Sequence, residues 1–259
     1  MNNLVCEQGS MCSAAFATGV RFSEKSVSLP GLATFPAGFQ RWLMELINAF
    51  VLAFVAILPM VNPFSKPPIF ISITEGLSAE ERIKQARKAS VYAFLILLAS
   101  LLGGSFILKF FSISLPALQI AGGLLIARTG FQMLSPCREH HQTDKEEQES
   151  REKEDISFVP LAMPLLSGPG AMAVMINLAT QVSHWVAWFA IAGASAAVCI
   201  ISYFVLIESA RLERALGENG MNALTKLMGF LILSMAVQFI ISGVSAALTA
   251  LAATLKLAP

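Results

Sequence analysis

The sequence predicts an all-α, polytopic membrane protein in which six transmembrane helices form two inverted three-helix repeats. The first helix of each repeat is expected to be broken at Pro and Gly residues. Three observations predict this fold class: long uncharged runs, Pro- and Gly-rich interruptions inside two of them, and a correspondence between the two halves. Of 259 residues, 55% are hydrophobic and 14% are charged, roughly half the charged share of a soluble domain.

Uncharged runs of about 18 residues or more are long enough to cross a hydrocarbon core of ~30 Å. The chain contains six such runs, which leave too little polar surface to cover a soluble helical protein. We therefore expect an integral membrane protein. The six expected spans are Leu46–Ser65 (continuing after Lys66 to Thr74), Ala89–Leu108, Phe110–Ala127, Ile156–Ser183, Trp185–Ile207 and Leu227–Leu255.

The segments outside these runs predict how the chain is organised. Residues 1–40 mix Ser, Gly, Pro and scattered charges and lack the basic and apolar regions of a secretory signal, so a disordered extension is expected. The most polar segment contains the pair His140-His141, which has no further metal ligand at helical spacing and indicates a solvated linker. The predicted parts are an N-terminal extension (1–40), a first repeat (41–134), a cytoplasmic linker (135–155) and a second repeat (156–259).

The distribution of basic residues predicts the orientation in the membrane. The connections after the first, third and fifth runs hold eleven Lys and Arg residues, whereas the opposite side holds five. Lys and Arg concentrate in cytoplasmic loops, so these three connections are expected in the cytoplasm and both termini in the periplasm.

Two interruptions distinguish the first and fourth runs. Residues 57–68 contain four prolines and an Asn-Pro step, and residues 163–170 end in Gly-Pro-Gly. Proline removes an amide donor and clashes with the preceding turn, so an intact helix is not expected to pass through either stretch. Hydrocarbon does not tolerate unpaired backbone groups, so both breaks must be enclosed by other spans.

The two halves of the chain correspond at an offset of 106 residues, the difference between positions 62 and 168. Each half has three spans, so the second half must cross the membrane with the opposite polarity. An inverted repeat with a broken first helix is the layout of many secondary transporters. The residues that coincide at this offset include Asn62-Pro63-Phe64 with Gly168-Pro169-Gly170, Gly123 with Gly229, and Gln132 with Gln238.

A helix that is interrupted inside the membrane offers amide hydrogens at the start of its second half and carbonyl oxygens at the end of its first half. The amides suit a carboxylate and the carbonyls suit an ammonium group, so two such breaks match a small zwitterion such as a neutral amino acid. The alternative is that Pro and Gly only kink the helices for packing. The predicted substrate-binding residues are Asn62, Pro63, Ser65, Ser167, Gly168, Pro169 and Gly170.

Four further residues are candidate supporting positions. Gln132 and Gln238 contact either a ligand or a neighbouring helix, and a hydrogen bond across a helix contact is the favoured interpretation. Gly123 and Gly229 permit close approach of helices, which supports the packing role.

Several classes of function lack the residues they need. No Asp or Glu lies at the centre of a span, so no carboxylate proton relay is visible. No phosphate-binding loop, catalytic set or metal-ligand spacing is present, so we expect no enzyme activity, cofactor or metal. The net charge of +1 gives no indication of nucleic-acid binding. Lys66 and Arg128 are the cations expected at membrane depth, and snorkelling of Arg128 to the cytoplasmic surface is the alternative to a functional role.

Three stretches carry a resemblance to a known family: Phe111–Leu124, Phe158–Gly170 and Leu227–Ile240. They resemble the corresponding stretches of the MarC family of six-span bacterial membrane proteins, and the resemblance runs from about Leu43 to the C-terminus. It implies a multi-pass protein of the bacterial cytoplasmic (inner) membrane. Some members are described as neutral amino acid transporters, which agrees with the zwitterion argument. Lys66 and Arg128 depart from the usual family pattern and argue against a purely neutral site.

The sequence therefore predicts a secondary transporter of small solutes, with neutral amino acids as the favoured class, that works by alternating access. Two alternatives remain open. One is a membrane scaffold or regulatory protein without transport activity, and the other is an exporter of amphiphilic compounds, which predicts a wide apolar cavity. The expected partners are the lipid bilayer and a small-molecule solute, with no nucleic acid and with a homo-oligomer left open.

Overall fold

The computed structural model describes residues 37–74, 76–135, 156–182 and 184–254. Within these ranges every regular element is a helix, so the predicted all-α class is confirmed there. Residues 136–155 of the predicted linker, with His140 and His141, lie outside the described residues. Most of the predicted extension lies outside them as well. The elements in order are α2 (Ala37–Val61), η1 (Pro63–Ser65), α3 (Pro67–Ile73), α4 (Ala79–Phe110), α5 (Leu115–Leu134), η2 (Ser157–Leu166), α7 (Pro169–Gln181), α8 (Trp185–Ile207) and α9 (Ser209–Thr254).

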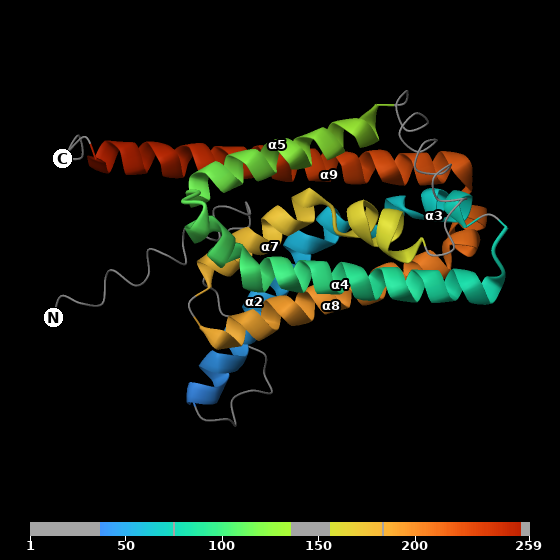
Figure 1. Ribbon diagram of the computed structural model, residues 1–259, viewed down its shortest axis with the longest axis horizontal. Coiled ribbons are helices and arrows are strands. Elements are labelled where there is room, and N and C mark those ends of the chain that lie inside the picture. Colours follow the sequence, from blue (N-terminus) through green and yellow to red (C-terminus); the bar gives the residue numbers. More distant parts are fainter. Residues whose placement is uncertain (1–36, 75, 136–155, 183, 255–259) are drawn as a thin grey trace.

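The interrupted segments lie between two pairs of long helices. In Figure 1, α5 and α9 run side by side along one side of the molecule and α4 and α8 along the other, with α3, η2 and α7 between them. α4 packs against η2, α7 and α8, while α2 packs mainly against α8. The irregular backbone therefore lies between regular helices, as a hydrocarbon environment requires, while Phe158, Val159 and Met163 of η2 have exposed side chains.

Four helical stretches are long and apolar enough to cross a membrane: Trp42–Ser65, Ala79–Phe110, Trp185–Ile207 and Asn219–Ala252. The third expected span corresponds to α5, whose apolar character is reduced by two glutamines and an arginine. The fourth expected span is divided between η2 and α7. Large apolar side chains such as Leu102, Phe106 and Phe189 are exposed on the outside of the bundle, where lipid would cover them.

Three helices, α2, α4 and α9, begin earlier than expected. α2 begins at Ala37, so residues 37–40 belong to a helix and not to the extension. α4 begins at Ala79, well before the apolar run, because Ser78 and Glu81 form a capping box. The Ser78 amide donates to the Glu81 carboxylate at 2.8 Å, and the Glu81 amide donates to Ser78 Oγ at 3.3 Å.

α9 also begins earlier than expected, at Ser209, and takes in the polar connection that follows α8. Its first turns are separated from the long apolar part by Gly217, which has φ 65° and ψ 171°. This backbone conformation is open to glycine and strained for other residues. The glycine therefore lets the chain bend before it enters the membrane-spanning part of α9.

α5 and α9 approach each other closely because glycines replace side chains along their contact. A Cβ atom on Gly130 would lie 3.0 Å from the carbonyl oxygen of Gly229 and 3.0 Å from the amide nitrogen of Leu233. A Cβ atom on Gly123 would lie 2.7 Å from Cγ1 of Ile240. Small residues let membrane helices pack backbone to backbone, so this pair is a rigid part of the fold.

Gly130→Ala tests this packing. The added methyl group meets backbone atoms of α9 that cannot move independently, so we expect a loss of about 1–3 kcal/mol in the free energy of unfolding. Gly103→Ala is the matched control, because a Cβ atom there meets nothing within 4 Å. Thermal unfolding in detergent micelles would compare the two variants, and equal midpoints would contradict the close contact.

Candidate functional site

The first interruption begins at Asn62. α2 runs through Pro59 without ending, and the chain leaves the helix at Asn62, the first of the predicted site residues. A single missing donor is tolerated within a membrane helix. The helix ends because Asn62 adopts a left-handed conformation, φ 47° and ψ 62°, which a right-handed helix cannot continue through. Asn is among the few residues other than Gly that adopt this conformation.

Prolines fix the chain after the break. Pro63 opens the single turn η1, and Pro67 opens α3, where the missing amide costs no helical hydrogen bond. Ser65 Oγ donates to the carbonyl oxygen of Asn62 at 3.3 Å. This serine, predicted as a ligand contact, thus satisfies a backbone group that the break leaves without a helical partner.

The second interruption is longer than the sequence predicted. Val159 (φ −126°, ψ 121°) and Met163 (φ −128°, ψ 119°) are extended, so η2 consists of short turns and not of one helix. Each precedes a proline, which disfavours the helical region for the residue before it. Gly168 is extended for the same reason, with φ −64° and ψ 167°, and Pro169 then opens α7.

The side chains of the two interruptions differ in burial. Asn62, Ser65 and Ser167 are buried, with exposed fractions of 2%, 6% and 0%. Pro63 is also buried, Gly168 and Gly170 are half-buried, and Pro169 is exposed. The polar side chains therefore face protein and not lipid.

Asn62 carries a buried polar atom that lacks a partner. Its Nδ2 donates to Sδ of Met133 on α5 at 3.4 Å. Its carboxamide oxygen Oδ1 is buried and has no hydrogen-bond partner among the described residues. Ser167 differs, because its Oγ donates to the carbonyl oxygen of Ala162 at 2.8 Å. A buried acceptor without a partner costs free energy, so a ligand donor at this position would be stabilising.

The two interruptions lie along the same helix, α5. Asn62 contacts Met133, and a Cβ atom on Gly170 would lie 3.0 Å from Cγ1 of Ile126. Ile126 and Met133 are seven residues apart, which is about two turns or ~10 Å along the helix. The breaks are therefore staggered along α5: the second lies beside its middle and the first beside its last turn.

A buried hydrogen bond sets the direction of α7 relative to α5. Gln119 Nε2 donates to Asn177 Oδ1 at 2.9 Å, and both residues are buried. Because Gln119 pairs with Asn177 while Ile126 lies against Gly170, the two helices run antiparallel. The chain before Gly170 therefore extends towards the end of α5 that contacts Asn62, and the two interruptions converge.

The Gln119–Asn177 pair was missed from the sequence. The repeat offset does not mark this pair, because Gln119 coincides with Thr225 and Asn177 with Ile71, so neither has a second amide side chain as its counterpart. A signal was available, because each is an amide side chain inside an otherwise apolar run. Only the packing of α5 on α7 brings the two together.

The candidate supporting residues occupy different surroundings. Gln132 on α5 and Gln238 on α9 are half-buried. Gly229 packs against α5, where a Cβ atom would lie 2.8 Å from Cβ of Met133, the residue that contacts Asn62. Arg128 is exposed on the outer face of α5, away from both interruptions. Among the residues that the structure describes, no three His, Cys, Asp or Glu side chains form a group that could hold a metal.

Comparison with known proteins identifies the family. The family model described as "MarC family integral membrane protein" matches residues 47–248, which include both interruptions. The chain belongs to the MarC family. The inner membrane protein MarC of Citrobacter koseri and that of Salmonella typhimurium are each 38% identical to it over 213 residues, covering 78% of this chain and 96% of the relative. The Escherichia coli O1:K1 protein is 37% identical over the same length, and no solved structure matches.

The family and the relatives confirm the resemblance predicted from the sequence. With its four long apolar helices, the chain is an integral inner-membrane protein of the MarC family.

A double-mutant cycle on Gln119 and Asn177 tests the buried pair. Gln119→Leu or Asn177→Leu alone leaves one amide without its partner, and we expect each to cost about 1–3 kcal/mol of unfolding free energy. The double variant is expected to cost less than the sum, by about 0.6–1.7 kcal/mol of coupling. Strictly additive losses in detergent unfolding would show that the pair does not interact.

Proposed function

We propose that this member of the MarC family is a secondary transporter of small solutes, with neutral amino acids as the favoured class and no enzymatic activity. The observation that carries the proposal is the unpaired carboxamide oxygen of Asn62, which is buried at a left-handed break in a membrane-spanning segment. A buried polar atom of this kind inside the membrane is a functional-site hypothesis by default.

The chemistry of the two interruptions suits a zwitterion. The Asn62 oxygen is an acceptor for an ammonium group. The second interruption ends at the N-terminus of α7, where no side chain caps the first turn. Amide hydrogens and the positive end of the helix dipole at that position favour a carboxylate. Residues 57–68 and 163–170 contain no Asp or Glu, which argues against a solute with a net positive charge.

The stagger between the breaks suggests how a solute moves. The interruptions are separated by about two turns of α5, so a solute passing from one to the other travels ~10 Å along the bundle. In this proposal the solute contacts Asn62 and the α7 terminus in turn, and a shift of the other helices against the α5–α9 pair opens each one to a different side of the membrane.

Helix placement supports an inverted repeat. The offset of 106 residues carries Ala79, the first residue of α4, onto Trp185, the first residue of α8. α4 packs against the interrupted segment of the second half, and α8 packs against that of the first half. α5 and α9, the last helices of the two halves, pack against each other. We therefore propose six spans in two repeats of opposite polarity, related by exchange of these contacts.

Uptake of a labelled neutral amino acid into vesicles that contain the purified protein tests the function. We expect alanine uptake above that of empty vesicles, and we expect Asn62→Gly to reduce it about tenfold or more, as for loss of a hydrogen bond to a charged group. Glycine keeps the positive φ, so the backbone can retain its course.

Ser112→Gly is the matched control for this variant. Ser112 is the other described non-glycine residue with positive φ, and it is exposed in the turn between α4 and α5. The Ser112→Gly variant should leave alanine uptake unchanged. Uptake equal to that of empty vesicles under imposed proton and sodium gradients would favour the scaffold or regulatory alternative. Efflux of amphiphilic compounds without alanine uptake would favour an exporter.

We further propose that both termini lie in the periplasm, on the basis of the charge distribution of the connections. Alkaline phosphatase is active only outside the cytoplasm, so a fusion after residue 259 should be active and a fusion within residues 136–155 inactive. Activity measured in intact cells tests this orientation. The reverse pattern would place both termini in the cytoplasm.

A further inference from the structure

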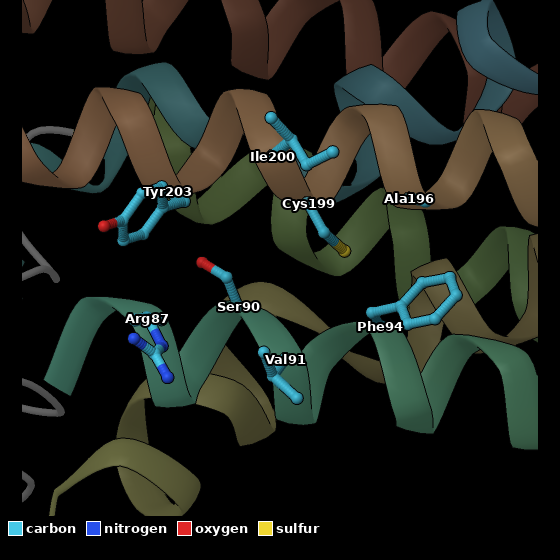
Figure 2. Close-up of a pocket in the computed structure, with 8 residues that line it drawn as sticks. All are labelled: Arg87, Ser90, Val91, Phe94, Ala196, Cys199, Ile200 and Tyr203. Carbon is cyan, nitrogen blue, oxygen red and sulfur yellow. The ribbon is translucent and has the colours of Figure 1, made fainter. Parts of the chain in front are cut away.

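A pocket of about 330 Å³ lies between α4 and α8, on helices that are outside the two interruptions. Figure 2 shows Arg87 and Tyr203 at one end of this pocket and Phe94 at the other. Because α4 begins and α8 ends at the Arg87 end, this end lies where the polar first turns of α4 meet the end of the apolar run. By the charge distribution this is the cytoplasmic side.

Arg87 gives one end of the pocket a positive charge, and the wall is otherwise almost entirely apolar. No carboxylate is among the residues that line the pocket, so the lining carries the charge of Arg87 alone. Ser90 is 7% exposed, and its Oγ has no hydrogen-bond partner among the described residues. Figure 2 shows the Ser90 hydroxyl directed into the space between the helices, on the same side as the Tyr203 ring. The guanidinium of Arg87 suits a phosphate group, whereas the Ser90 hydroxyl is buried in the wall.

The rest of the pocket is apolar and opens on the outside of the bundle. Val91 and Ile200 line it and are 50% and 55% exposed. Phe94 closes the far end. These side chains face the region that lipid tails occupy in a membrane, so a ligand with an aliphatic chain would enter from the bilayer and not from water.

We propose that this pocket binds an anionic membrane phospholipid. Its phosphate lies against Arg87, and one acyl chain lies along Val91, Phe94 and Ile200. Basic pockets between membrane helices on the cytoplasmic side bind anionic head groups, and an arginine at the end of an apolar run lies at head-group level. The proposal does not depend on the transport function, since the pocket shares no residue with the two interruptions.

Native mass spectrometry of the purified protein tests the preference. Equal amounts of phosphatidylglycerol and phosphatidylcholine with the same acyl chains are added, and the bound fraction of each is measured. We expect the wild type to retain phosphatidylglycerol preferentially. Arg87→Gln should reduce that preference about fivefold, as expected for one basic residue near a membrane surface.

Lys84→Gln is the matched control, because Lys84 lies one turn earlier on α4, is exposed and does not line the pocket. The Lys84→Gln variant should leave the preference for phosphatidylglycerol unchanged. Equal retention of the two lipids by the wild type, or equal losses in both variants, would overturn the proposal. When oleate is added in place of phosphatidylcholine, preferential retention of oleate would also overturn the proposal, since that result would identify a carboxylate ligand.

Photocrosslinking in phosphatidylglycerol vesicles locates the lipid without relying on Arg87. A photoreactive residue at position 91 should crosslink to phosphatidylglycerol more strongly than the same residue at position 106. Phe106 is on the same helix and is 71% exposed, but it does not line the pocket. Equal crosslinking at both positions would mean that only bulk lipid is contacted, and it would contradict a specific site.

Discussion

The structure depends on one constraint: backbone amides and carbonyls inside a membrane must find partners within the protein. Two segments of this chain cannot meet the constraint as continuous helices, because Asn62 is left-handed and prolines hold Val159 and Met163 in extended conformations. Serine hydroxyls satisfy part of the deficit locally, at the carbonyls of Asn62 and Ala162. The surrounding long helices cover the buried side of the remainder, and Phe158, Val159 and Met163 stay exposed on the other side.

The α5–α9 pair gives these interruptions a fixed support. Gly123, Gly130 and Gly229 remove side chains along the contact, so the two backbones lie close. The face of α5 towards the interior then presents Met133 to the first interruption and Ile126 to the second. One closely packed helix pair therefore contacts both interruptions.

Polar side chains in the apolar region are few, and their placement separates structural from functional roles. Gln119 and Asn177 satisfy each other and align α7 on α5. Asn62 retains a buried oxygen without a partner at the first interruption. An unpaired oxygen inside a membrane protein is costly unless something binds it, and this is why the first interruption is proposed as a binding site.

The sequence by itself determined the class of protein, the family, and the approximate position of both interruptions, because hydropathy and proline act locally on the chain. It also identified Gly123 and Gly229 as positions of close approach. It did not decide which proline within residues 57–68 the helix passes, because this depends on how the surroundings satisfy one lost hydrogen bond, and α2 continues through Pro59 to Val61.

Only the tertiary structure decided which residues meet. The contact of Asn62 with Met133, the Gln119–Asn177 pair and the pocket between α4 and α8 all join residues from different helices. Such contacts depend on the rotation and stagger of each helix, which packing sets and which an apolar run does not encode, since every face of it is equally hydrophobic.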